Sequence, residues 1–262
     1  MAKKIVVTSG KGGVGKTTVV ANLGFALAKL GQRVALVDID FGLNNLDVVT
    51  GVENKILYDI SDVFNGRCRV KQALVQCNLS KNLYVLPSGN VGVQNAISGQ
   101  SVKLILEQIS PLFDYVLIDC PAGIDVGFHR AVCCADQAIV VATPSATSLR
   151  DADKVISILK SYKLDKIVLV VNRARGDLMV GEKMMMPKDI ESLLKIELIG
   201  VFPEEDAVFL SLGYGLPLRC ESSKAYKILA QNVHKGTKKI FDVTGKYCGI
   251  LGSIRRGLKR SV

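Results

Sequence analysis

Residues 10–18 carry glycine, lysine and threonine at a spacing that suits a nucleoside triphosphate. They read GKGGVGKTT and satisfy the phosphate-loop pattern G-x-x-x-x-G-K-[ST]. Glycines let the backbone approach phosphate oxygens closely, and successive N–H groups at a helix N-terminus form an anion site. A lysine at position 16 would reach the β- and γ-phosphates, and the Thr17 hydroxyl would ligate Mg²⁺. The predicted contacts are Gly10, Lys11, Gly12, Gly13, Val14, Gly15, Lys16, Thr17 and Thr18.

The loop contains a second lysine, Lys11, which one nucleotide does not require. An ammonium group near the start of the loop could instead reach the nucleotide of a second subunit. Lys11 therefore predicts a homodimer with two nucleotides at its interface, and we assign both Lys11 and Lys16 catalytic roles.

Aspartates follow two strand-like runs that lie further along the chain. Asp38 and Asp40 end VALVDID, and Asp119 ends DYVLID. Strand ends at the carboxyl edge of a parallel sheet face the ligand crevice. We expect Asp119 to hold Mg²⁺, and Asp40 to orient the attacking water or support the magnesium shell. The alternative for each is a loop cap or turn residue.

Two further segments are candidates for the base pocket. Asn172 and Arg173 end KIVLVVNR, where a GTPase would usually show N-K-x-D, so adenine and hence ATP is favoured. Pro203 to Asp206 (PEED) follow the last expected strand and are the candidate for the opposite wall, with Pro203 as the named contact; a simple turn is the alternative.

The elements that must position these residues alternate between strand and helix. Apolar runs with β-branched residues are typical of buried parallel strands, and helical periodicity separates them. We predict an α/β fold, a doubly wound and mostly parallel sheet of the P-loop NTPase type with helices on both faces. The expected strands are 3–9, 33–38, 82–86, 114–119, 137–142, 166–171 and 197–201, and the expected helices are 17–31, 101–109, 148–162, 187–195 and 222–241.

Composition is ordinary for a soluble protein, with 48% hydrophobic and 22% charged residues. No apolar run approaches the ~18–20 residues of a membrane-spanning helix. A strand beginning near Lys3 leads us to expect no secretory signal and a cytosol-like compartment. The seven cysteines show no C-x-x-C pair and are read as reduced thiols. An iron–sulfur cluster shared between subunits, through Cys120 or the Cys133–Cys134 pair, is the alternative.

Positive charge is concentrated at the C-terminus. Residues 246–262 contain no acid and supply half of the net charge of +10. From residue 249 onward, aliphatic and basic residues segregate to two faces of a helix, the pattern of an interfacial helix on anionic lipid. Gly252 and Gly257 predict a poor helix in water that folds on the membrane; the alternative is a disordered solubilising tail. We divide the chain into an ATPase domain, 1–245, and a membrane-targeting segment, 246–262, whose contacts are Ile250, Leu251, Ile254, Arg255, Arg256, Leu258 and Lys259.

A family pattern is present in segments 11–17, 38–51, 65–74, 114–124, 149–156, 170–173 and the basic C-terminus. In these segments the chain resembles the deviant Walker A ATPases, the MinD/ParA family. The resemblance implies partner-stimulated ATP hydrolysis, ATP-driven dimerisation and ATP-dependent membrane binding. Lys11 would contact nucleotide across the dimer, and Asp151 or Asp153 would hold it in the monomer. The septum-placing members imply a MinC-like septum inhibitor and a MinE-like stimulating factor as partners.

The resemblance leaves alternatives. Asn44 replaces an arginine that the family usually has, which weakens the inference about partners. A ParA-type DNA-partition ATPase would bind nucleic acid through its basic residues, but phosphates gain nothing from the aliphatic residues of the tail, so nucleic acid is not expected. A flagellar-number ATPase and an electron-transfer ATPase are further alternatives. The expected location is the cytoplasmic face of the cell membrane, or alternatively the plastid stroma and inner envelope.

Overall fold

A computed structural model of the chain describes residues 1–41, 45–78, 80–89, 97–208 and 220–259. Its strands form one eight-stranded sheet in the order β3-β4-β2-β5-β1-β6-β7-β8, parallel except for the β3–β4 pair. The predicted doubly wound α/β fold is confirmed. The strands are β1 (Lys3–Thr8), β2 (Val34–Asp38), β3 (Val75–Gln76), β4 (Leu83–Leu86), β5 (Tyr115–Asp119), β6 (Gln137–Ala142), β7 (Lys166–Ala174) and β8 (Glu197–Pro203).

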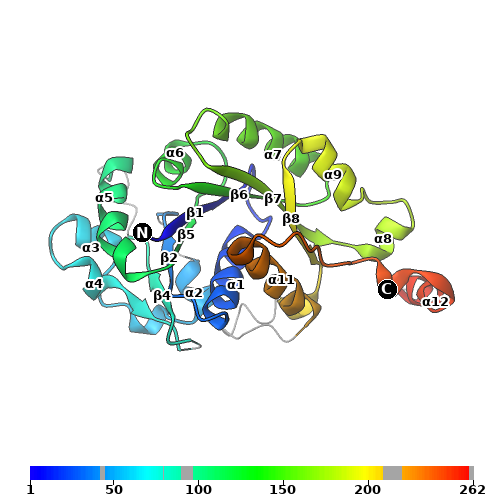
Figure 1. Ribbon diagram of the computed structural model, residues 1–262, viewed down its shortest axis with the longest axis horizontal. Coiled ribbons are helices and arrows are strands. Elements are labelled where there is room, and N and C mark those ends of the chain that lie inside the picture. Colours follow the sequence, from blue (N-terminus) through cyan, green and yellow to red (C-terminus); the bar gives the residue numbers. More distant parts are fainter. Residues whose placement is uncertain (42–44, 79, 90–96, 209–219, 260–262) are drawn as a thin grey trace.

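Helices cover both faces of this sheet (Figure 1). One face carries α1 (Lys16–Lys29) and α11 (Glu221–Lys235), and the other carries α5 (Gly99–Ile109), α6 (Val126–Val132), α7 (Ala146–Leu159) and α9 (Pro187–Leu194). The remaining helices are α2 (Leu46–Thr50), α3 (Ile60–Phe64), α4 (Val70–Ala73), α8 (Gly176–Val180) and α12 (Gly249–Lys259), with the 3-10 turns η1 (Glu53–Lys55), η3 (Ser110–Leu112) and η4 (Gly245–Tyr247).

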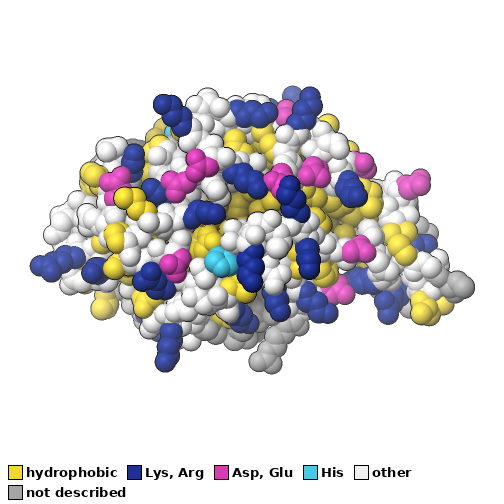
Figure 2. All heavy atoms as spheres, viewed as in Figure 1, with side chains coloured by type: hydrophobic (Ala, Val, Ile, Leu, Met, Phe, Trp, Pro, Cys, Tyr) yellow, Lys and Arg dark blue, Asp and Glu magenta, His cyan; other side chains and the backbone are white. Residues whose placement is uncertain are grey.

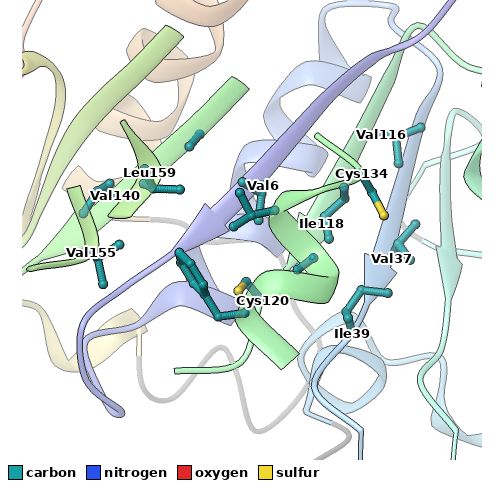
Figure 3. Close-up of a cluster of buried hydrophobic side chains, with 14 of the residues drawn as sticks. Val6, Val37, Ile39, Val116, Ile118, Cys120, Cys134, Val140, Val155 and Leu159 are labelled. Carbon is teal, nitrogen blue, oxygen red and sulfur yellow. The ribbon is translucent and has the colours of Figure 1, made fainter. Parts of the chain in front are cut away.

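Alternate residues of each central strand point to opposite layers, and therefore each strand is apolar on both faces. On β1, Val6 belongs to the layer under α5, α6 and α7, whereas Ile5 and Val7 belong to the layer under α1 and α11. Figure 3 shows the first layer, where Val6, Val37 and Ile118 converge with side chains from β6 and α7. These two cores hold the strand ends at fixed positions.

Two details differ from the sequence prediction. The helix expected over 222–241 ends at Lys235, because Gly236 adopts a left-handed conformation with φ 67° that terminates it. The edge strand β3 is antiparallel and only two residues long, too short for a periodic signal.

The C-terminal residues 249–259 form the helix α12, which projects from the body beyond α8 (Figure 1). Among the described residues, no helix is both long enough and apolar enough to span a bilayer. The Asn44 position lies outside the described residues.

Candidate nucleotide site

The sheet register brings three loop segments together at one edge. Strand β5 lies between β1 and β2, and Asp119 is the register partner of both Val7 and Asp38. The phosphate loop after β1 therefore begins beside the carboxyl groups that end β2 and β5. The Gly123 amide, in the loop after β5, donates to the Ser9 carbonyl at 3.1 Å and ties the two loops together.

The loop backbone has a shape that only glycine allows. Gly13 and Gly15 have φ values of 75° and 93°, in the left-handed region. A Cβ on Gly15 would lie 2.4 Å from Asn172 Nδ2, and one on Gly10 would lie 2.3 Å from the Asp151 backbone. Asn172 Nδ2 in turn donates to the Val14 carbonyl at 2.8 Å. The loop is thus held against β7 and α7, while Gly12 and Gly13 leave open space over its outer side.

Lys16, Thr17 and Asp119 meet beneath this loop. Lys16 is only 8% exposed, and the Thr17 hydroxyl donates to the Asp119 carboxylate. Burial raises the pKa of Asp119 to about 6, and the Thr17 hydroxyl and the Lys16 charge oppose that rise. The carboxylate oxygen Oδ1 of Asp119 is buried without a hydrogen-bond partner.

An ionised carboxylate with one unpaired oxygen beside a threonine hydroxyl matches the hard oxygen ligands that Mg²⁺ prefers. The open glycine cradle above it has the shape and the N–H donors for phosphate oxygens. These residues therefore fit a magnesium-bound nucleotide, with Thr17 and Asp119 on the metal side.

The two aspartates after β2 differ in their surroundings. Asp38 is buried, and burial together with the neighbouring Asp119 raises its pKa well above the usual range. Its Oδ1 accepts from the Asp40 amide at 2.8 Å, so Asp38 shapes the loop that presents Asp40. Asp40 is half-buried, and burial raises its pKa while the Lys16 charge lowers it. Asp40 is therefore the more accessible carboxyl beside Lys16.

A cavity of about 340 Å³ adjoins the loop at Gly15 and Thr18. The predicted residues Asn172, Arg173 and Pro203 all line it. Its walls include residues that the sequence analysis did not identify. Those are Phe202, Val208, Ser222 and Tyr226, whereas Glu204, Glu205 and Asp206, which also line the cavity, belong to the predicted PEED segment.

The part of the cavity wall that the sequence did not predict includes a stacked aromatic pair. The rings of Phe202 and Tyr226 lie 4.0 Å apart at an angle of 23°. Helical spacing in α11 marks Tyr226 as a core residue, which it is, but no pattern shows that β8 leaves a gap beside it. A flat, apolar wall next to a phosphate loop suits a purine base.

Lys11 lies apart from this buried group. Its side chain is exposed, and within the described part of the chain it forms no ion pair. Of the two acids suggested as its partner, Asp151 pairs with Lys154 at 3.5 Å, and Asp153 is exposed on the same helix. The structure thus separates the two loop lysines, one buried with the carboxylates and one facing outward.

Cys120 follows Asp119 directly and is fully buried. Burial raises the pKa of its thiol to about 12, so it is a protonated core residue. It lies among Ile39, Ile118 and other apolar side chains (Figure 3). A sulfur in this position is not presented to a second subunit, which argues against a shared cluster ligand.

The predicted membrane residues that the structure describes lie on α12, outside the nucleotide cavity. Leu251 and Ile254 are 75% and 57% exposed, and Arg255 is exposed beside them. Hydrophobic and basic side chains gather over α12 (Figure 2). The side chains of Ile250, Leu258 and Lys259 lie outside the described part of the structure.

Comparison with known proteins identifies the family. A family model described as an AAA domain matches residues 2–170. The septum site-determining protein MinD of Synechocystis is 41% identical over 98% of this chain and 99% of its own length. The chain belongs to the MinD family. MinD-family membership, with the phosphate loop described above, makes it a P-loop ATPase.

Solved MinD structures have the same fold. The MinC:MinD complex of Aquifex aeolicus matches at 39% identity and a TM-score of 0.85, covering 92% of this chain and 98% of the solved one. MinD of Pyrococcus horikoshii, solved with Mg-ADP, matches at 29% identity and a TM-score of 0.81, covering 90% and 97%. A MinD-family protein with this fold therefore binds a magnesium nucleotide, as the residues at this site suggest for the present chain.

Proposed function

We propose that this MinD-family ATPase dimerises with ATP, binds an anionic membrane as a dimer, and places the division septum by recruiting a septum inhibitor. Hydrolysis, stimulated by a second protein partner, returns it to a monomer that leaves the membrane. The MinC:MinD complex of Aquifex aeolicus supports an inhibitor of the MinC type as the recruited partner. A MinE-like protein is the proposed stimulating factor.

One observation supports the proposed dimer: the phosphate loop has one buried lysine, Lys16, and one exposed lysine, Lys11. Lys16 is 8% exposed and lies beside Asp119 and Asp40, so one nucleotide already has its cation. Lys11 points outward from the same loop, where a second copy of the chain would meet it. A positive charge placed against phosphates across an interface makes dimer stability depend on how much phosphate is bound.

The remaining residues have distinct roles in this proposal. The amides of residues 12–17 and the Lys16 ammonium hold the phosphates, and the cavity beside Asn172, Arg173 and Pro203 takes adenine. When bound, Mg²⁺ neutralises phosphate charge. Thr17 and Asp119 would hold it. Asp40 accepts a hydrogen bond from the attacking water and orients it, and Asp38 fixes the Asp40 amide.

Weak binding by one tail suits this cycle. One short helix with two well-exposed aliphatic side chains binds marginally, whereas two tails on a dimer share one encounter, and the second binds at raised effective concentration. The membrane-bound state then follows the dimer, and the location of the protein at the cytoplasmic face of the membrane follows the nucleotide state.

The direct test compares Lys11→Ala with Lys29→Ala, which removes an exposed lysine from the far end of α1. We expect Lys11→Ala to stay monomeric with a non-hydrolysable ATP analogue while binding nucleotide within about tenfold of wild type, since Lys16 remains. Lys29→Ala should dimerise normally. Light scattering after size exclusion measures the mass, and a normal Lys11→Ala dimer would contradict the cross-interface role.

The membrane arm uses vesicles of phosphatidylglycerol and phosphatidylcholine with ATP or ADP, with duplex DNA as a competitor. We expect sedimentation with ATP only, and loss of sedimentation on deletion of residues 249–262 with the dimer retained. Equal sedimentation with ADP would refute the nucleotide switch. Displacement by DNA would favour the partition alternative instead.

A further inference from the structure

Helix α6, which follows the Asp119 loop, carries a buried cation. Among the described residues, the only buried lysine and arginine side chains are Lys16 and Arg130. The phosphates that Lys16 would contact account for its burial, whereas Arg130 is 4% exposed and has no part in the functions proposed above. Taking a guanidinium out of water costs free energy, and burial lowers the pKa of Arg130. An apolar side chain of similar size would avoid that cost, which points to a specific task for this arginine.

The Arg130 guanidinium lies over the ring of Phe41. Its central carbon is 5.2 Å from the ring centroid, within the range of a cation–π contact. Phe41 is 5% exposed and packs in the hydrophobic layer beneath α5, α6 and α7. It follows Asp40 directly in the chain. The stacked pair therefore joins the helix after β5 to the loop after β2, one residue from the carboxyl that would orient water.

The backbone that carries Asp40 is held on both sides. On the strand side, Asp38 Oδ1 accepts a hydrogen bond from the Asp40 amide at 2.8 Å. On the other side, Phe41 is buried beneath Arg130. An aspartate side chain is short and follows its backbone closely, so these two anchors determine where the Asp40 carboxylate lies.

Helix α6 gives the arginine a firm support. At the start of the helix, a Cβ on Gly127 would lie 2.6 Å from Pro121 Cγ, so the helix packs closely on the loop after β5. At its end, the thiols of Cys133 and Cys134 each donate to the Arg130 carbonyl at 3.2 Å. Cys134 is itself buried in the apolar layer (Figure 3). Arg130 thus extends from a helix that is fixed at both ends.

We propose that Arg130 is a positioning residue for ATP hydrolysis: its buried guanidinium holds Phe41 in place, and Phe41 in turn keeps Asp40 turned toward the bound nucleotide. A planar cation is attracted to the face of an aromatic ring, so it restricts the ring more than an aliphatic side chain would. Arg130 acts here through Phe41 and does not touch the reacting atoms. The inference rests on the proposed water-orienting role of Asp40 and specifies what keeps that carboxyl in position.

A double-mutant cycle between Arg130→Met and Phe41→Leu tests whether the two residues act together. Methionine keeps an unbranched side chain without the planar cation, and leucine keeps an apolar side chain without the ring. Phosphate release at saturating MgATP gives kcat. We expect each single substitution to lower kcat about tenfold, because a displaced Asp40 orients water poorly. Affinity for a fluorescent ATP analogue should stay within about twofold of wild type, because the phosphate loop is unchanged.

The double variant distinguishes a shared role from two separate ones. If Arg130 acts through Phe41, the double variant should lose about tenfold to twentyfold in kcat, whereas independent losses would multiply to about a hundredfold. Arg130→Lys retains the charge and should recover kcat to within about threefold of wild type. Arg67→Met, which removes an exposed guanidinium, is the control and should retain normal kcat.

Unchanged kcat in Arg130→Met, or losses that multiply in the double variant, would overturn the positioning role. If Arg130→Met does not fold, Phe41→Leu decides, and a kcat within twofold of wild type would overturn the proposal. Asp40→Ala tests the proposed function separately. Normal turnover by Asp40→Ala would refute the water-orienting role and, with it, the action of Arg130 on Asp40. Slowed turnover by Asp40→Ala together with independent losses in the cycle would refute the role of Arg130 alone.

Discussion

The nucleotide site and helix α12 hold their functional residues in different ways. In the nucleotide site, Lys16, Asp38 and Asp119 are buried, and their positions follow from strand register and loop backbone. On α12, Leu251 and Ile254 are exposed, and one glycine contact with a few polar bonds to the preceding turn sets their position. The hydrophobic core fixes the first region, whereas a few contacts between α12 and the turn η4 position the second.

This difference matches what each region must do. Phosphate and metal ligands must be preorganised, because misplacement of such groups by about 1 Å costs much of the catalytic rate. A surface that attaches to a membrane and detaches again must instead have only a weak affinity for it. A modest change in avidity then moves the protein between the bound and the free state. The predictions below test this contrast, beginning with the change that should be most damaging.

Gly15→Ala should abolish nucleotide binding. The new Cβ would lie 2.4 Å from Asn172 Nδ2, on a residue whose φ of 93° already disfavours a side chain. We expect more than a hundredfold loss of affinity for a fluorescent ATP analogue and a fall in Tm of about 4–10 °C. Gly66→Ala is the control, since its φ is 71° but its Cβ would meet open space. The Gly66→Ala variant should show a lower Tm and an unchanged affinity for the ATP analogue. If Gly15→Ala bound the analogue within threefold of wild type, the claim that the loop backbone fixes the nucleotide site would be wrong.

Asp119→Asn should stop Mg²⁺-dependent turnover yet stabilise the ligand-free protein. The folded-state pKa of Asp119 is raised to about 6, so the folded protein holds this proton more tightly than the unfolded chain does. Stability contributed by the protonated form is present at low pH and is lost as the pH rises toward and through 6. Asparagine does not ionise, so the variant does not lose this stability as the pH rises. We expect its free energy of unfolding to exceed that of wild type by about 1–3 kcal/mol at pH 7.

Urea unfolding of the ligand-free protein between pH 4.5 and 7 measures this gain, with exposed Asp125→Asn as the control. In wild type, the Mg²⁺-dependent part of nucleotide affinity should fall by up to about tenfold per pH unit below 6, because the metal needs the ionised carboxylate. Identical pH profiles for wild type and Asp119→Asn would show that this carboxyl is not strained by burial.

Asp40→Ala should slow turnover by about a hundredfold without preventing nucleotide binding. Asp40 is half-buried beside Lys16, and the loop geometry is set by Asp38, which stays in place. The variant should therefore accumulate as an ATP dimer on vesicles, measured by phosphate release and sedimentation. Half-buried Asp47→Asn on α2 should behave like wild type. Unchanged phosphate release by Asp40→Ala would remove Asp40 from the mechanism and leave the water to another group.

The sequence predicted the buried nucleotide site better than the contact between α12 and η4, for physical reasons. Strand runs and the glycine loop have strong local signals, and the carboxyl ends of parallel strands lie at one edge of the sheet, so the meeting of Asp119 with the loop was predictable. Phe202 and Tyr226 were not, because helix and strand patterns mark burial without showing where a cavity opens. Apolar residues continue past Gly236 and suggested a longer helix, but its left-handed φ ends α11. The contact of Gly252 with Tyr247 has no periodic signature, and Gly252 was therefore read only as a helix breaker.

Glu221→Gln should have the smallest effect of these substitutions, and it tests how η4 and α12 are held to the body. The Lys246–Glu221 pair anchors η4 to α11, but its side chains are 33% and 39% exposed, so solvent screens it and its loss costs about 0.5 kcal/mol or less. Trypsin cleavage after Arg255 and Arg256 should rise by about twofold at low salt, and the difference from wild type should vanish at high salt. Arg67→Gln, which removes an exposed pair with Asp62 far from α12, should leave this cleavage unchanged. A much larger rise with Glu221→Gln would mean that the ion pair, rather than the backbone contact at Gly252, holds the helix to the body.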